Sequence, residues 1–135
     1  MFGGRPILVL TCVILASVLM DCSCNKRMDS EVAGRAAKIY YDCLIRGDYE
    51  SFVDGYCQPE RIPDGYRSQL IDNAKMFAAQ QQREREGIRE VQLLRCTADT
   101  ATHRAKAFLL LCFGDSTREE VLVPMVEHEG VWMMR

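Results

Sequence analysis

The apolar pattern of this chain changes its period at Gly87, and that change most constrains what the chain can fold into. Before it, apolar residues recur every three or four positions, as on one face of an α-helix. After it, β-branched and apolar residues alternate with a period of two, as in strands that bury one face. Helices followed by consecutive strands predict an α+β domain in which one face of the sheet packs on the helices.

Three helices are predicted before this change. The first runs from Ser30, a candidate N-cap, to a stop at Gly47, and Asp48 caps a shorter second helix. The third is expected from Tyr66 to Glu86 and ends at Gly87. Its Gln- and charge-rich final turns keep no heptad pattern, which favours an exposed helix end over a coiled coil.

Four strands are predicted in the last part of the chain, and the short turns between them favour antiparallel neighbours. Both faces of the second strand are apolar beyond Lys106, which predicts a central position, and Pro124 suits an edge or a bulge in the third strand. The expected strands are Val91 to Thr97, Arg104 to Phe113, Glu119 to Val126 and Val131 to Met134.

The N-terminus has the pattern of an export signal. Behind Arg5, an uncharged apolar run extends from Ile7 to Met20 and ends at Asp21. This run is too short for a bilayer, which needs about 20 helical residues. We therefore expect a signal peptide over residues 1–21, a polar tether over 22–29 and one domain over 30–135.

The end of the apolar run resembles a bacterial lipobox. Leu19-Met20-Asp21-Cys22 places a cysteine after apolar residues, and Cys24, which follows Ser23, is a second candidate. We favour Cys22 as the lipidation site. The resemblance implies a protein exported and membrane-anchored in the bacterial cell envelope, on its periplasmic or its surface face, because acyl chains hold a domain at a membrane.

Composition argues against two classes of partner. The net charge is −2, with seventeen Lys and Arg against nineteen Asp and Glu, so no basic stripe favours nucleic acid. The only histidines are His103 and His128, and no C-x-x-C motif occurs, so neither a metal site nor a cofactor is expected.

The cysteines of the domain allow two interpretations. Cys43, Cys57, Cys96 and Cys112 are expected as buried free thiols, since Cys is a common small core residue. The alternative is a bridge between the first two and another between the last two, although neither spacing is diagnostic.

No catalytic residue can be assigned. Tyr40, Tyr41 and Asp99 are possible acid–base groups, but a core aromatic or a turn residue explains each of them more simply. Met125 and Trp132 could line an adaptable apolar pocket. The residues expected to form a pocket are Tyr40, Phe77, Leu109, Leu111, Met125 and Trp132.

Short motifs in a characteristic order resemble the nuclear transport factor 2-like, or cystatin-like cone, superfamily, in a branch of small bacterial lipoproteins that carry a domain of unknown function. The resemblance implies a curved four-stranded sheet wrapped around three helices as a cone, often with an open pocket, and a possible homodimer through the exposed sheet face. The motifs are Ala36-Ala37-Lys38-Ile39-Tyr40-Tyr41, Gly47-Asp48-Tyr49, Thr100-Ala101, Val123-Pro124-Met125-Val126 and Gly130-Val131-Trp132.

Fold alone does not decide function, because that superfamily holds isomerases, dehydratases and proteins without known catalysis. We expect a non-catalytic envelope module that binds a small apolar ligand or a partner protein. The alternative is an isomerase or dehydratase of the ketosteroid-isomerase type, which needs a carboxylate base in an apolar cavity.

Overall fold

The computed structural model describes residues 27–58 and 63–135, so the expected signal peptide and both candidate lipidation cysteines lie outside the described residues. The first described element is a long helix over residues 27–45, called the N-terminal helix below. Residues 27–29, expected in the tether, are helical. Ser30 lies inside this helix, which corrects its assignment as an N-cap, and its hydroxyl instead accepts a hydrogen bond from the Ala98 N–H at 3.1 Å.

A short second helix follows the expected stop. Gly47 has a φ of 80°, a left-handed conformation that favours glycine. Helix α2 (Tyr49–Asp54) then begins after Asp48, whose side chain accepts a hydrogen bond from the Ser51 N–H. The predicted turn and cap are therefore confirmed.

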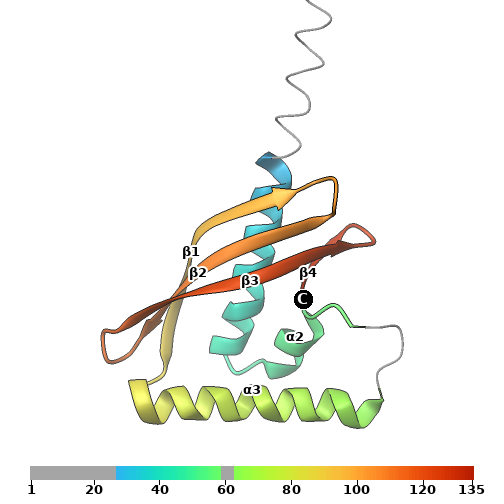
Figure 1. The fold of residues 1–135 in the computed structure, drawn as a ribbon. Coiled ribbons are helices and arrows are strands. Elements are labelled where there is room, and N and C mark those ends of the chain that lie inside the picture. Colours follow the sequence, from blue (N-terminus) through green and yellow to red (C-terminus); the bar gives the residue numbers. More distant parts are fainter. Residues whose placement is uncertain (1–26, 59–62) are drawn as a thin grey trace, which may run out of the picture.

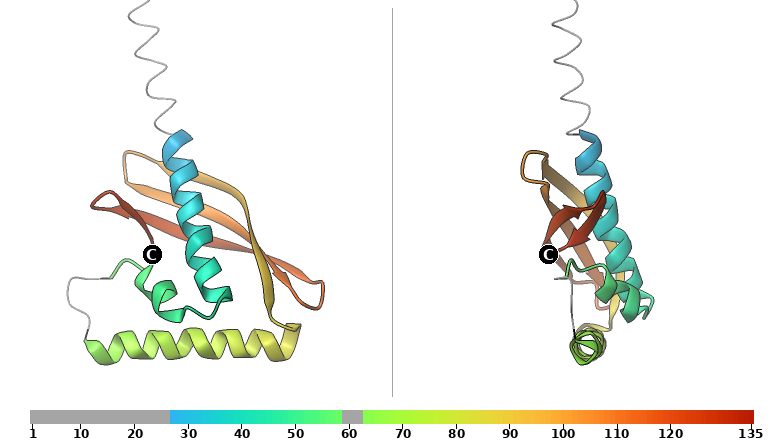
Figure 2. Two further views of the ribbon diagram at one scale, coloured as in Figure 1. Left: turned by 180° about the vertical axis from the view of Figure 1, so that it is seen from behind. Right: turned by 90° about the vertical axis from the view of Figure 1, so that its right-hand side faces the viewer.

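Helix α3 (Asp64–Arg85) closely matches its predicted range. Glu86 takes the left-handed conformation at its end, and the N–H of Gly87, also left-handed, bonds to the Gln81 carbonyl. Of its residues only Ala74 is buried. Figures 1 and 2 show the reason, since α3 runs across one end of the molecule, below α2, and not over the face of the sheet.

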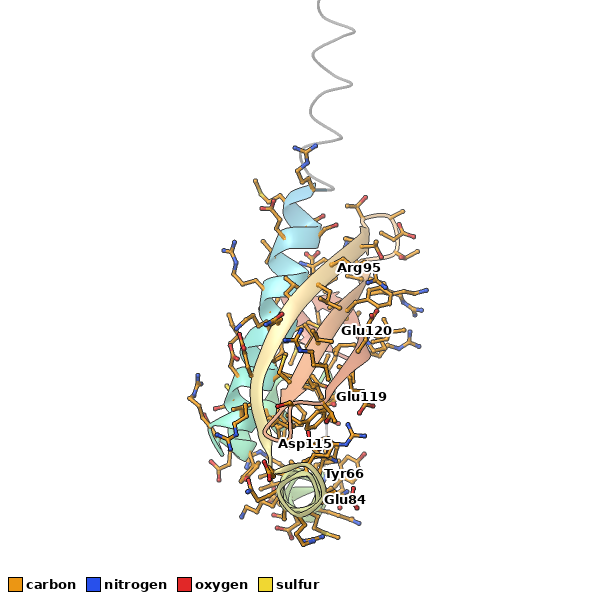
Figure 3. The ribbon with its side chains drawn as sticks, turned by 90° about the vertical axis from the view of Figure 1, so that its left-hand side faces the viewer. Tyr66, Glu84, Arg95, Asp115, Glu119 and Glu120 are labelled. Atoms are coloured by element: carbon orange, nitrogen blue, oxygen red, sulfur yellow. The ribbon has the colours of Figure 1, made fainter. Side chains whose placement is uncertain are left out.

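The strands form an antiparallel meander in the order β1-β2-β3-β4. They are β1 (Ile88–Asp99), β2 (Arg104–Phe113), β3 (Arg118–His128) and β4 (Val131–Met134). Strand β1 is bulged between Leu93 and Arg95, and such bulges bend a strand. Figure 3 shows this curvature. The α+β class and the four antiparallel strands are thus confirmed.

Pro124 lies next to the end of the pairing between β3 and β4, which extends from Met125 to His128 of β3. It pairs with Lys106 of β2, and its carbonyl accepts a hydrogen bond from the Arg135 N–H at 3.0 Å. The N–H and C=O of a strand residue point to the same side, so the N–H that proline lacks would face the end of β4. The predicted edge position therefore holds locally, although β3 lies between two strands.

The core lies between the N-terminal helix and one face of the sheet, the inner face, and the two elements form distinct layers in the right-hand view of Figure 2. In β2 the buried residues alternate with more exposed ones, so Leu109 is fully buried and Leu110 lies on the other face. The buried strand residues are Val91, Ala98, Ala105, Ala107, Leu109, Leu111, Phe113, Val123, Met125, Trp132 and Met134.

The four described cysteines are free thiols, which agrees with the first of the two interpretations. Cys96 is opposite Ala107 and Cys112 is opposite Glu90, so the two lie several pairs apart along the β1–β2 ladder. This register explains why they do not form a bridge.

The two faces of β2 should respond differently to truncation. We expect Leu109→Ala to lower the free energy of unfolding by about 3 kcal/mol, because it leaves a cavity in a fully buried site. Leu110→Ala, the matched control on the half-buried outer face, should cost less than about 1.5 kcal/mol. Urea unfolding followed by circular dichroism measures both, and equal losses would contradict this register.

Candidate binding cleft

An open cleft of about 550 Å³ lies where the N-terminal helix, α2 and α3 meet. Most of its lining is apolar or aromatic. We call it the aromatic cleft. Its described lining consists of Tyr41, Leu44, Phe52, Val53, Tyr56, Cys57, Gln58, Tyr66, Leu70, Asn73, Ala74, Phe77 and Arg135.

Three aromatic rings in edge-to-face contact form one wall of the aromatic cleft. Tyr41 meets Phe52 edge to face, with ring centroids 5.5 Å apart, and Phe52 meets Tyr56 in the same way at 5.6 Å. Edge-to-face pairs at these separations are favourable beyond the area that they bury. The wall therefore joins the N-terminal helix to α2 and to the segment that follows α2.

The adjacent tyrosines of the N-terminal helix have different roles. The Tyr40 hydroxyl donates a hydrogen bond to the Trp132 carbonyl at 2.8 Å and so ties the helix to β4. The Tyr40 ring lies against Gly55, where an added Cβ would come within 2.5 Å of the ring. Gly55 is therefore required for this contact, and Tyr41, one position further along the helix, lines the aromatic cleft.

Burial controls the protonation of the cleft tyrosines. Desolvation, with a smaller effect from the neighbouring Tyr56, raises the pKa of Tyr41 to about 12. Desolvation also raises the pKa of Tyr56. Both phenols are therefore neutral hydrogen-bond donors at neutral pH. Arg135 supplies the charged side chain in the described part of the lining.

A second depression, of about 670 Å³, lies at the end of the sheet beside the β1–β2 turn. It is more polar than the aromatic cleft, with Arg104, Lys106 and Arg135 along it. Asp99 also contributes, but its carboxylate accepts a hydrogen bond from the Ala101 N–H at 3.0 Å and stabilises the turn. Asp99 therefore has a structural role here.

The six residues expected to form a pocket lie in different places. Leu109, Leu111, Met125 and Trp132 come together in the core, each at most 5% exposed; Met125 also lines the second depression, and none of the four lines the aromatic cleft. Phe77 does line it, and Tyr40, which is not in its described lining, lies against Gly55. The structure thus brings four of the six together in the core, one of which also lines the second depression, and one to the aromatic cleft.

Sequence reasoning missed most of the aromatic cleft. Of its described lining, Phe77 alone is among the six residues expected to form a pocket. In the structure the face of α3 that carries Tyr66, Leu70, Ala74 and Phe77 is a wall of the cleft. The weak signal was the distribution of aromatic residues, which concentrates Tyr and Phe in the helical part of the chain.

Among described residues, no group of three His, Cys, Asp or Glu side chains is placed to hold a metal ion. The described helices also include none that is long and apolar enough to span a bilayer.

Comparison with solved structures identifies the fold. A Campylobacter jejuni protein named as an NTF2-like transpeptidase superposes with a TM-score of 0.59 at 20% sequence identity, over 73% of this chain and 92% of the other. This chain has a nuclear transport factor 2-like fold. A SEC-C motif-containing protein from Rhodopseudomonas palustris also matches, with a TM-score of 0.48 and 16% identity, over 70% of this chain and 67% of the other. No protein-family model and no curated protein matches the chain.

This likeness establishes the nuclear transport factor 2-like fold and leaves the activity to be argued from the site, because one fold serves many functions. In this example of the fold, the N-terminal helix covers the inner face of the sheet, and the aromatic cleft opens beside α2 and α3.

The raised pKa of Tyr41 predicts a loss of stability in alkali. An unfolded tyrosine ionises near pH 10, whereas Tyr41 in the folded chain keeps its proton up to about pH 12. The unfolded state therefore binds fewer protons in this window, and stability falls as pH rises through it. We expect Tyr41→Phe to remove up to about 2 kcal/mol of that loss.

Urea unfolding at pH 9 and pH 11.5 measures this difference. Tyr66→Phe is the matched control, because Tyr66 is 47% exposed. A Tyr41→Phe variant that loses as much stability in alkali as the unmodified chain would contradict the assignment.

Proposed function

We propose that this protein is an exported, lipid-anchored cell-envelope protein whose domain binds a small apolar ligand in the aromatic cleft, without catalysis. The observation that carries the proposal is the cleft itself, an open volume of about 550 Å³ with mainly apolar and aromatic walls. Ligand sites in proteins commonly have volumes of about 300 to 1,000 Å³ and apolar linings with a few polar groups.

Exposed aromatic surface supports this proposal. Phe77 is 40% exposed and Tyr66 is 47% exposed, although both lie on the cleft side of α3. A ligand that covers these rings would remove apolar area from water, which is favourable at roughly 25 cal/mol per Å². The free energy of binding would therefore come mainly from apolar contact.

The position of the cleft suits a membrane anchor. We propose that the chain belongs to a branch of small bacterial lipoproteins, with residues 1–21 removed and Cys22 lipidated, or Cys24 in its place. In Figure 1 the N-terminal helix begins at the end of the domain opposite α3. An anchor on that side would leave the aromatic cleft facing away from the membrane.

A second candidate function is self-association through the outer face of the sheet. Figure 3 shows Arg95 and Glu120 on the face opposite the N-terminal helix, and they form an ion pair at 2.9 Å. The Arg95 guanidinium lies 3.9 Å from the centre of the Phe108 ring, and the neighbouring Leu122 is 50% exposed. This partly apolar face favours a homodimer, or an envelope protein in place of the second copy.

The isomerase or dehydratase alternative needs a carboxylate base that faces an apolar cavity. The polar side chains in the described lining of the aromatic cleft belong to Tyr, Gln, Asn, Cys and Arg. No observation on the described residues favours that reaction class, and we do not carry it further.

A neutral fluorescent probe tests the binding site. We expect N-phenyl-1-naphthylamine to bind the full chain and Phe77→Asp to weaken binding by at least about tenfold, because a carboxylate on the apolar wall must be desolvated. Met76→Asp is the matched control, since Met76 is adjacent but 68% exposed and outside the cleft lining. Equal affinities for the two variants would contradict the assignment of the site.

Intact mass measured on membrane fractions tests the proposed lipid anchor. We expect a chain that starts at Cys22 and carries a diacylglyceryl group, and Cys22→Ser should abolish this species while Cys24→Ser leaves it unchanged. The opposite pattern would move the anchor to Cys24. An unmodified chain that retains residues 1–21 would overturn the lipoprotein proposal.

A further inference from the structure

Three of the polar groups in the described lining of the aromatic cleft share one chemical preference. The lining includes the phenols of Tyr41 and Tyr56 and the guanidinium-bearing Arg135. A protonated phenol can donate a hydrogen bond, and a guanidinium donates several and carries a positive charge. These three groups are suited to a ligand that brings acceptor oxygens and negative charge.

The two phenols belong to the same group of contacting rings, and the neighbouring Tyr56 contributes to the raised pKa of Tyr41. Phe52 lies between their rings and contacts both edge to face. Within the described part of the chain, neither hydroxyl has a hydrogen-bond partner, whereas that of Tyr40 is bonded to Trp132. Two donor groups on one wall are therefore available to a ligand.

The side chain of Arg135 is likewise available to a ligand. Arg135 follows β4, where its N–H bonds to the Pro124 carbonyl at 3.0 Å, and it lines both the aromatic cleft and the second depression. Nearby, Arg67 is paired with Asp54 at 2.9 Å. Arg135 forms no ion pair with any described residue, and the described lining of the cleft includes no Asp or Glu.

We propose that the ligand is an apolar monocarboxylate, a molecule with an aromatic or aliphatic body and one carboxylate group. This inference rests on the proposed function. The carboxylate accepts hydrogen bonds from Tyr41 and Tyr56 and pairs with Arg135, while the body lies against Phe52 and Phe77. Charge-assisted bonds of this kind are stronger than neutral ones, so the carboxylate contributes to affinity as well as to orientation.

The same walls argue against a cationic ligand. Aromatic faces attract ammonium groups, so a cleft with these rings alone could bind an amine. Arg135 opposes that preference, because its guanidinium places a like charge in the lining, whose described residues include no Asp or Glu. We therefore expect discrimination in the order acid, alcohol, amine.

Three probes with one body test this order on the full chain. They are 2-naphthoate, 2-naphthalenemethanol and 2-naphthylmethylammonium, and isothermal titration calorimetry at pH 7 measures each affinity. We expect the acid to bind about tenfold more tightly than the alcohol, and the amine to bind more weakly than both.

Two arginine variants identify the charge responsible. Arg135→Gln should reduce the affinity for 2-naphthoate to about that for the alcohol, while the affinity for the alcohol stays within about twofold. Arg118→Gln is the matched control, because Arg118 is exposed at the start of β3 and lies outside the cleft lining. It removes the same charge from the chain and should change neither affinity.

The outcomes separate the two proposals. Equal affinity of the unmodified chain for acid and alcohol overturns the carboxylate inference and leaves the apolar site intact. Equal losses in Arg135→Gln and Arg118→Gln also overturn it, since net charge and not the site would then set the preference. Failure of all three probes to bind overturns the inference together with the proposed function.

Discussion

The close contact of the N-terminal helix with β1 determines the rest of the architecture. At Gly34 an added Cβ would come within 2.9 Å of the Cys96 Cβ, so helix and strand approach more closely than a larger residue would allow. The Ser30 hydroxyl accepts a hydrogen bond from the Ala98 N–H in the same region. Ala33 and Ala37 are fully buried at the same interface. Small side chains and one hydrogen bond thus set the helix directly on the inner face.

Because this helix occupies the inner face, α3 has no sheet surface to cover and lies across one end of the molecule. It contributes one buried residue, Ala74, and leaves Tyr66 and Phe77 partly exposed. The cleft forms between α3 and the wall of aromatic rings that the N-terminal helix, α2 and the segment after α2 contribute. Its position is therefore a consequence of how the two layers pack.

The end of β4 connects the sheet to this site. The Met134 N–H bonds to the Gly55 carbonyl at 2.8 Å, and the Cys57 N–H bonds to the Met134 carbonyl at 2.7 Å. These bonds attach the segment after α2 to the sheet and bring Arg135 beside Tyr56. The Tyr40 hydroxyl bond to Trp132 supports the same junction.

Local pattern was sufficient to predict the elements but not the site. The apolar period of two after Gly87 and the Gly47-Asp48 turn have local causes, so the α+β class, the meander and α2 followed from sequence. The placement of α3 did not, because its stripe of Tyr66, Leu70, Ala74 and Phe77 is equally consistent with burial on a sheet. Whether Tyr40 or Tyr41 lines a cleft depends on the contact with Gly55, which is set by tertiary packing. The six expected pocket residues were chosen for apolarity, which does not distinguish a core residue from a cleft residue.

The central claim is that the aromatic cleft, and not the outer face of the sheet, is where this protein binds a small molecule. The most direct measurement is a ¹⁵N-resolved NMR titration of the full chain with N-phenyl-1-naphthylamine. We predict that the perturbed amides cluster at Tyr41, Phe52, Tyr56 and Phe77. Perturbations confined to Phe108, Leu110 and Leu122 on the outer face, or an unperturbed spectrum, would contradict this account.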